Sequence, residues 1–150
     1  MNYVQNLNKA VCILMLLLIP TLANAEYKFA KDWSKADTAW ECTFLAIIAV
    51  DWAQTHWAAK RDFYWDGHQH DETNIFLGSR PSTSKVDTLI PLGMLAHTLV
   101  AMALPSKFEV YDSNIGTVNI NFRRIWQCTW IVGEVTAVGI NYSAGIRLEW

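Results

Sequence analysis

The sequence predicts an all-α fold: a small transmembrane helical bundle with three spans after cleavage of an N-terminal signal peptide, or four spans if that segment is kept. Three long stretches carry a single ionisable side chain near the middle. They lie between Glu41 and Lys60, between Asp87 and Lys107, and between Arg124 and Arg147. Each has about 20 residues, the length of a helix that crosses a hydrocarbon core of about 30 Å.

Composition agrees with a membrane protein. The chain is 52% hydrophobic and 17% charged, and its mean hydropathy of +0.11 averages apolar stretches with a polar middle segment. A net charge of -2 without a basic stripe gives no support for a nucleic-acid partner. Among eight Trp, five lie near the ends of the apolar stretches, as expected at a membrane interface or, alternatively, in an ordinary core. These are Trp40, Trp57, Trp65, Trp126 and Trp150.

Residues 1–25 are typical of a secretory signal peptide. Lys9 precedes the apolar run Val11 to Ile19, Pro20 ends that run, and Ala23 and Ala25 supply small residues for cleavage. Cleavage leaves residues 26–150 as a single helical membrane domain. An uncleaved anchor helix is the alternative.

The three spans are expected at about 38–59, 87–106 and 124–143. Gly and Pro between Lys60 and Ser84 predict a loop, with a short helix at Glu72 to Leu77. Ser84 and Asp87 have the spacing of a capping box for the second helix, and Pro91 falls inside it.

A second loop is expected from Lys107 to Asn121, with turn residues at Asp112 to Asn114. Within it, Thr117 to Phe122 alternates in polarity like a strand. The sequence therefore predicts at most a short extended segment between the second and third helices.

Asp51, His97 and Glu134 are the main candidates for a binding site. Each lies about ten residues, or about 15 Å, into its predicted span, so the three would share one membrane depth. A charge at that depth costs at least about 2.5 to 3.5 kcal/mol, so such residues usually pair or bind something. Two carboxylates and an imidazole are suitable ligands for a divalent metal with an open position, and they can equally share protons. The identity of any cofactor stays open.

Further polar residues lie on the same helical faces. Gln54 and Thr55 follow Asp51 by one turn, and Gln127, Glu134 and Asn141 recur every seven residues. The site hypothesis therefore includes Gln54, Thr55 and Asn141. The alternative is that these side chains form interhelical hydrogen bonds, worth about 0.6 to 2 kcal/mol each, that only hold the bundle together.

The middle loop offers a second, alternative site. His68, His70 and Asp71 lie close together in sequence, between Asp66 and Glu72, and two His residues two apart can chelate a metal on a strand. A solvated polar loop explains them as well. The chain has no Walker A, G-x-S-x-G, H-E-x-x-H or paired C-x-x-C motif, which leaves open whether it is an enzyme.

Two short motifs carry a resemblance to other proteins. Asp51-Trp52-Ala53-Gln54-Thr55 and Glu72-Thr73-Asn74-Ile75-Phe76-Leu77-Gly78 resemble the D-x-x-Q-T span and the E-T-N-x-x-L-G loop of uncharacterised small multi-pass membrane proteins of bacteria and phages. Ile75 stands where Pro is common in that group. The resemblance implies a membrane location and adds Glu72 and Asn74 to the candidate site, but it implies no reaction.

Two functional hypotheses follow. The first is a bacterial inner-membrane, multi-pass protein whose intramembrane acidic and His residues bind a cation, a proton or a lipid head group. The second is a non-enzymatic phage or mobile-element envelope factor that acts by association in the host membrane. The lipid bilayer is the expected partner, and a homo-oligomer is an open alternative. A soluble periplasmic helical domain and an outer-membrane barrel are alternative architectures.

Overall fold

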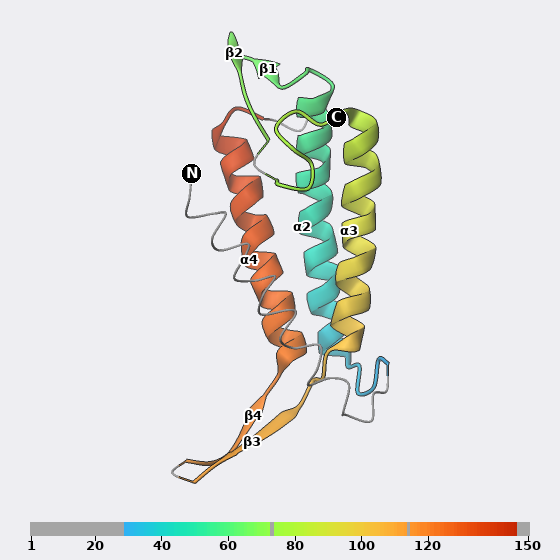
Figure 1. Ribbon diagram of the computed structural model, residues 1–150, viewed down its shortest axis with the longest axis vertical. Coiled ribbons are helices and arrows are strands. Elements are labelled where there is room, and N and C mark those ends of the chain that lie inside the picture. Colours follow the sequence, from blue (N-terminus) through green and yellow to red (C-terminus); the bar gives the residue numbers. More distant parts are fainter. Residues whose placement is uncertain (1–28, 73, 114, 147–150) are drawn as a thin grey trace.

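The computed structural model describes residues 29–72, 74–113 and 115–146, and the predicted signal peptide lies outside them. Three long helices stand side by side, with α2 between α3 and α4 (Figure 1). α2 and α4 run in the same direction, and α3 runs opposite to both (Figure 1). The elements are α2 (Lys35–Ala59), β1 (Tyr64–Trp65), β2 (His68–Gln69), α3 (Thr83–Ala103), β3 (Phe108–Asp112), β4 (Gly116–Ile120) and α4 (Phe122–Ser143).

The predicted all-α fold is wrong, because two antiparallel hairpins join the helices. β3 pairs with β4 from Phe108 opposite Ile120 to Asp112 opposite Gly116, and this hairpin projects beyond the end of the helices (Figure 1). β1 and β2 form a much shorter hairpin in the loop after α2. The short helix expected at Glu72 to Leu77 is absent from the described part of this loop, and residues 75–77 are a turn. The alternation after Thr117 did indicate a strand, but its partner from Phe108 lay in a segment with loop-like composition.

The prediction of three membrane spans also needs correction. Within the described residues, α3 alone is long and apolar enough to cross a membrane. α2 and α4 fall short because polar residues within them, such as Gln54 in α2 and Gln127 and Asn141 in α4, lower their mean hydropathy. By length and composition, one span is therefore supported, and only weakly.

Side-chain caps set the helix starts. Ser34 accepts from the amide of Asp37 while the Asp37 carboxylate accepts from the Ser34 amide, a capping box that starts α2 earlier than predicted. The expected box at Ser84 is absent from the described structure. Instead Ser82 accepts from the amide of Lys85 at 3.3 Å, so α3 begins at Thr83.

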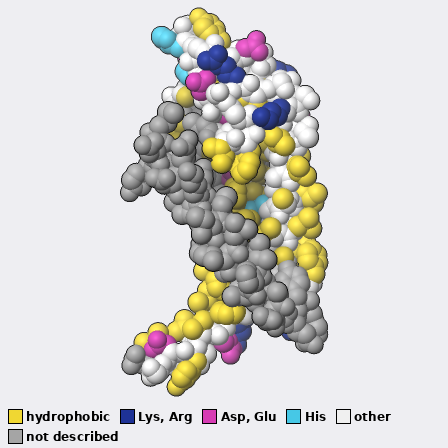
Figure 2. Space-filling model, viewed as in Figure 1, with side chains coloured by type: hydrophobic (Ala, Val, Ile, Leu, Met, Phe, Trp, Pro, Cys, Tyr) yellow, Lys and Arg dark blue, Asp and Glu magenta, His cyan; other side chains and the backbone are white. Residues whose placement is uncertain are grey.

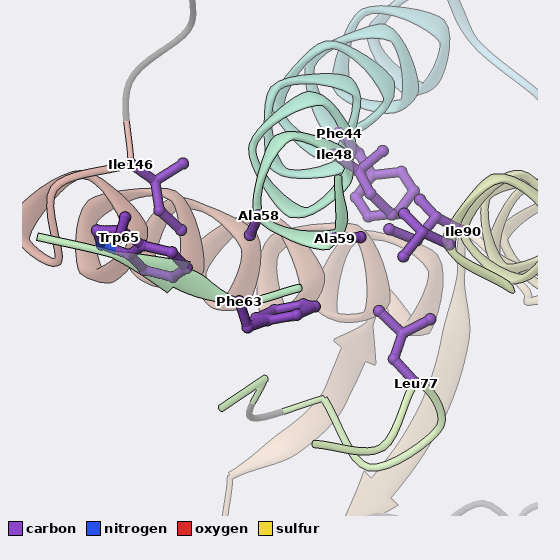
Figure 3. Close-up of a cluster of buried hydrophobic side chains, with 10 residues drawn as sticks. Phe44, Ile48, Ala58, Ala59, Phe63, Trp65, Leu77, Ile90 and Ile146 are labelled. Carbon is purple, nitrogen blue, oxygen red and sulfur yellow. The ribbon is translucent and has the colours of Figure 1, made fainter. Parts of the chain in front are cut away.

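The apolar core wraps around α2 (Figure 3). Phe44, Ile48 and Ile90 fill the space between α2 and α3 (Figure 3). At the end of the bundle the loop after α2 folds back, and Trp65 donates from its indole nitrogen to the Ala144 carbonyl at 2.8 Å. This cluster fixes the middle loop over the ends of α2 and α4.

Polarity is inverted along the helices. No exposed position of α2 from Thr38 to Ala59, or of α4 from Ile125 to Ser143, carries a charged residue. Large apolar side chains are exposed instead, namely Leu92, Leu95 and Leu99 on α3 and Ile125, Val132, Val135 and Ile140 on α4. The buried polar residues are Asp37, Glu41, Gln54, Thr55, His97, Arg123 and Gln127. On the face in Figure 2, charged side chains gather toward the two ends of the molecule, with hydrophobic ones between them.

Candidate functional site

A buried hydrogen-bonded group joins all three helices near the start of α2. The Glu41 carboxylate accepts from His97 Nδ1 at 2.9 Å, from Thr98 Oγ1 at 2.7 Å and from Gln127 Nε2 at 3.1 Å. Glu41 and His97 are each 4% exposed. Because an ionised carboxylate only accepts, Nδ1 is the ring nitrogen of His97 that carries the hydrogen.

An ion pair lies one turn earlier on α2. The Asp37 carboxylate binds Arg123 Nη1 at 3.1 Å and Arg124 Nη2 at 3.0 Å. Arg123 is 1% exposed, and such a charge is tolerated only when it is paired and hydrogen-bonded. Its guanidinium also donates to three backbone carbonyls, those of Lys31, Asp32 and Ala101. This pair therefore locks the start of α4 to the start of α2 and to the segment before it.

The imidazole of His97 is held in an aromatic setting. Its ring stacks on Phe44 with centroids 3.7 Å apart and lies 5.3 Å from Trp126 and 5.9 Å from Trp130. His97 Nε2 is buried and has no hydrogen-bond partner among the described residues. Buried polar atoms are normally satisfied, so an open acceptor here indicates a place for a ligand or water.

His97 lines a cavity of about 370 Å³ enclosed by the three helices and the loop before α3. Its wall is largely apolar and comes from Phe44, Ile48, Phe76, Leu77, Leu89, Ile90, Leu92, Gly93, Ala96, Val100, Trp126 and Trp130. The polar lining consists of Asp51, Asn74, His97 and Glu134. Sites for small molecules commonly have this combination of an apolar wall and a few polar groups.

The carboxylates that line this cavity, Asp51 and Glu134, lie among polar and acidic side chains. Asp51 accepts from Asn141 Nδ2 at 2.9 Å, an interhelical hydrogen bond of the kind considered as the alternative to a binding role. Asp51 interacts electrostatically with two further acidic side chains, Glu72 and Glu134. Within the described residues, no Lys, Arg or His forms an ion pair with Asp51 or Glu134.

The structure separates the three predicted site residues in depth. His97 is level with Glu41, whereas Asp51 is ten residues further along α2, about 15 Å away. The prediction of one shared depth placed His97 in the middle of a span at 87–106, but α3 runs from Thr83 to Ala103, so His97 lies near the end of the helix rather than at its middle. No described group of three His, Cys, Asp or Glu side chains has the arrangement to hold a metal ion, which removes the expected metal site.

The other predicted residues play different parts. Gln54 and Thr55 are buried but do not line the cavity. Asn74 lines it and shapes its rim, because Asn74 Oδ1 accepts from the Phe76 amide and the Asn74 amide donates to Glu72 Oε1. This turn holds Phe76 and Leu77 against the cavity.

The alternative loop site does not form among the described residues. His68 is exposed on β2, while His70 stacks on Trp65 with centroids 3.8 Å apart. Asp71 forms an exposed ion pair with Arg80 at 3.0 Å. These side chains are therefore engaged separately, and they do not converge on a shared ligand position.

Several important residues were missed from the sequence. From the sequence, Glu41 is used only as the boundary of an apolar stretch, and Asp37 and Arg123 are not among the candidate residues. A signal did exist: Glu41, Phe44, Ile48 and Asp51 have spacings of three, four and three, so they share one helical face. That spacing would have placed Glu41 inside the bundle.

No protein-family model matches the chain, and neither a curated protein nor a solved structure matches it. The resemblance to small multi-pass membrane proteins stays a prediction.

Proposed function

We propose that this protein is a multi-pass protein of the bacterial inner membrane that binds an amphiphilic molecule in the cavity between its helices. The inverted polarity supports a lipid environment, since water would favour the charged side chains outside and the apolar ones inside. α2, α3 and α4 have 25, 21 and 22 residues, or about 31 to 38 Å, enough to cross a hydrocarbon core.

Charge placement supports the same location. Several polar residues that lower the mean hydropathy of α2 and α4 are buried in the bundle, so lipid would not contact them; these are Glu41, Gln54, Arg123 and Gln127. Intramembrane ionisable residues characteristically face a bundle interior and pair there. Average hydropathy therefore understates how apolar the outer surface of these two helices is.

The observation that carries the binding function is the open Nε2 of His97. This atom is buried, and His97 lines a cavity of about 370 Å³ together with Asp51 and Glu134. An occupant that matches this lining has an apolar body and at least one polar group. An amphiphile that enters from the surrounding lipid meets both requirements.

A pair of glycine substitutions tests the proposal. Gly93 lines the cavity, Gly139 does not, and a Cβ at either position meets no heavy atom within 4 Å. Gly93→Leu should fill the cavity, whereas Gly139→Leu adds the same side chain elsewhere on a helix.

The measurement is native mass spectrometry of the full chain, extracted from membranes in detergent and then incubated with single-chain C12 amphiphiles. We expect the wild type and Gly139→Leu to retain a bound amphiphile and Gly93→Leu to lose it. Extraction by carbonate without detergent would reject the membrane location. Equal binding by both leucine variants would reject the cavity as the site.

A further inference from the structure

We propose that the amphiphile in this cavity carries a cationic amine, which binds between Asp51 and Glu134. This inference rests on the proposed function and names the chemical class of its ligand. It starts from the charges in the cavity, which are all acidic.

Among the described residues, no Lys, Arg or His forms an ion pair with Asp51 or Glu134 at the acidic end of the cavity. Asp51 interacts with Glu72 and Glu134, and like charges that interact in an apolar setting repel each other strongly. Asn141 supplies one hydrogen bond to Asp51, but an amide cannot neutralise a carboxylate. An ammonium group would supply the missing positive charge and donate hydrogen bonds to both acids.

The acidic residues alone would not define a site, but the opposite part of the cavity gives an independent indication of a ligand. His97 is 4% exposed, and its Nε2 has no partner among the described residues. Nδ1 donates its hydrogen bond to Glu41, so in the neutral imidazole Nε2 is the acceptor. The cavity thus offers acceptors at both ends and no described Lys or Arg in its lining, which suits a hydrogen-bond donor and disfavours an anion.

The apolar wall between these ends accounts for the rest of the ligand. The side chains of Ile48, Leu89 and Val100 line it, with the rings of Trp126 and Trp130 beside His97. The face of a Trp ring also attracts cations, so the aromatic wall tolerates a positively charged ligand during entry. A bare metal ion would leave this apolar wall uncovered.

Three probes of equal chain length separate the head-group chemistry: dodecylamine, dodecanol and dodecanoate. Binding to the full chain in neutral maltoside micelles is measured by quenching of Trp fluorescence and by native mass spectrometry. We expect dodecylamine to bind at least about tenfold more tightly than dodecanol, and dodecanoate to bind most weakly.

Three variants identify the responsible carboxylates. Glu134→Gln and Asp51→Asn should each reduce the preference for dodecylamine to less than about threefold while leaving dodecanol binding unchanged. Asp51→Asn keeps an oxygen that accepts from Asn141, which guards against misfolding. Glu109→Gln removes an exposed carboxylate on β3 and should keep the full preference.

The outcomes separate the two proposals. If dodecanol and dodecylamine bind equally and Gly93→Leu abolishes both, the cavity is a binding site but the cationic ligand is rejected. A preference that survives in both Asp51→Asn and Glu134→Gln also rejects it. If no probe binds the wild type, the proposed function itself fails.

Discussion

His97 and Glu41 are joined by a 2.9 Å hydrogen bond between Nδ1 and Oε1, although they are 56 residues apart in the sequence. This bond fixes the imidazole of His97, which lines the cavity and whose Nε2 is buried without a hydrogen-bond partner among the described residues. The same carboxylate accepts from α4, so one buried acid on α2 aligns all three helices.

Replacing Glu41 by Leu should destabilise the protein strongly. His97 Nδ1 would lose the only acceptor described for it, and a buried unsatisfied donor costs about 1 to 3 kcal/mol. Thr98 and Gln127 would lose one partner each but keep the backbone carbonyls of Met94 and Asp37 as acceptors. Glu41→Gln keeps one acceptor oxygen and should lose less. Denaturant unfolding followed by Trp fluorescence measures both. A Glu41→Leu variant as stable as the wild type would mean that this group does not hold the helices.

The ion pairs of Asp37 and Glu109 should differ in their contribution to stability. Asp37→Ala leaves the guanidinium of Arg123 buried without its counter-ion, a loss of about 3 to 5 kcal/mol. Glu109→Ala breaks an exposed pair with Lys107 and should change the stability far less. Thermal unfolding of the two variants in the same detergent makes the comparison. Similar losses in both would contradict the buried role of Asp37.

Asp51 and Asn141 should be energetically coupled. Asn141→Ala removes the hydrogen bond to Asp51 and leaves the carboxylate with one fewer donor, at a cost of about 1 to 3 kcal/mol. In a double-mutant cycle, Asp51→Ala combined with Asn141→Ala should cost less than the sum of the single changes. Strict additivity in unfolding free energies would show that the two side chains do not interact.

The start of α3 can be tested with two serines. Ser82→Ala removes the N-cap acceptor and should cost about 0.5 to 2 kcal/mol. Ser84→Ala lies inside the first turn, where no described hydrogen bond of its side chain would be lost, and should be nearly neutral. The melting temperatures of the two variants measure this difference. A larger loss of stability in Ser84→Ala than in Ser82→Ala would indicate that Ser84 caps α3, as the sequence alone predicted.

Cys42 reports whether α2 contacts lipid. Its side chain is exposed on the outer surface of the helix, yet in a bilayer it should be shielded from water. In sonicated membranes, with Cys12 and Cys128 replaced by Ser, a charged maleimide should fail to label Cys42 until the membrane is dissolved in SDS. Ser113→Cys, in the exposed turn after β3, should be labelled throughout. Rapid labelling of Cys42 in intact membranes would place α2 in water.

Local sequence determined much of the helical architecture. Apolar stretches around Asp51, His97 and Glu134 became three helices whose bounds differ by a few residues from those expected, because helical propensity and capping act over neighbouring residues. The spacing of Gln127, Glu134 and Asn141 likewise indicated which face of α4 turns inward, and Gln127 and Asn141 do contact α2.

Tertiary structure decided which polar groups meet. Glu41 pairs with His97 and Asp51 with Asn141 because α3 runs against α2 while α4 runs along it, and that register follows from packing across whole helices. The pairing of β3 with β4 was not predicted either, because the partner of a strand depends on side-chain contacts across the two strands. The spacing of residues within one helix shows which side chains share a face. Which side chains of different helices pair, and at which level of the bundle, depends on how the helices pack against one another.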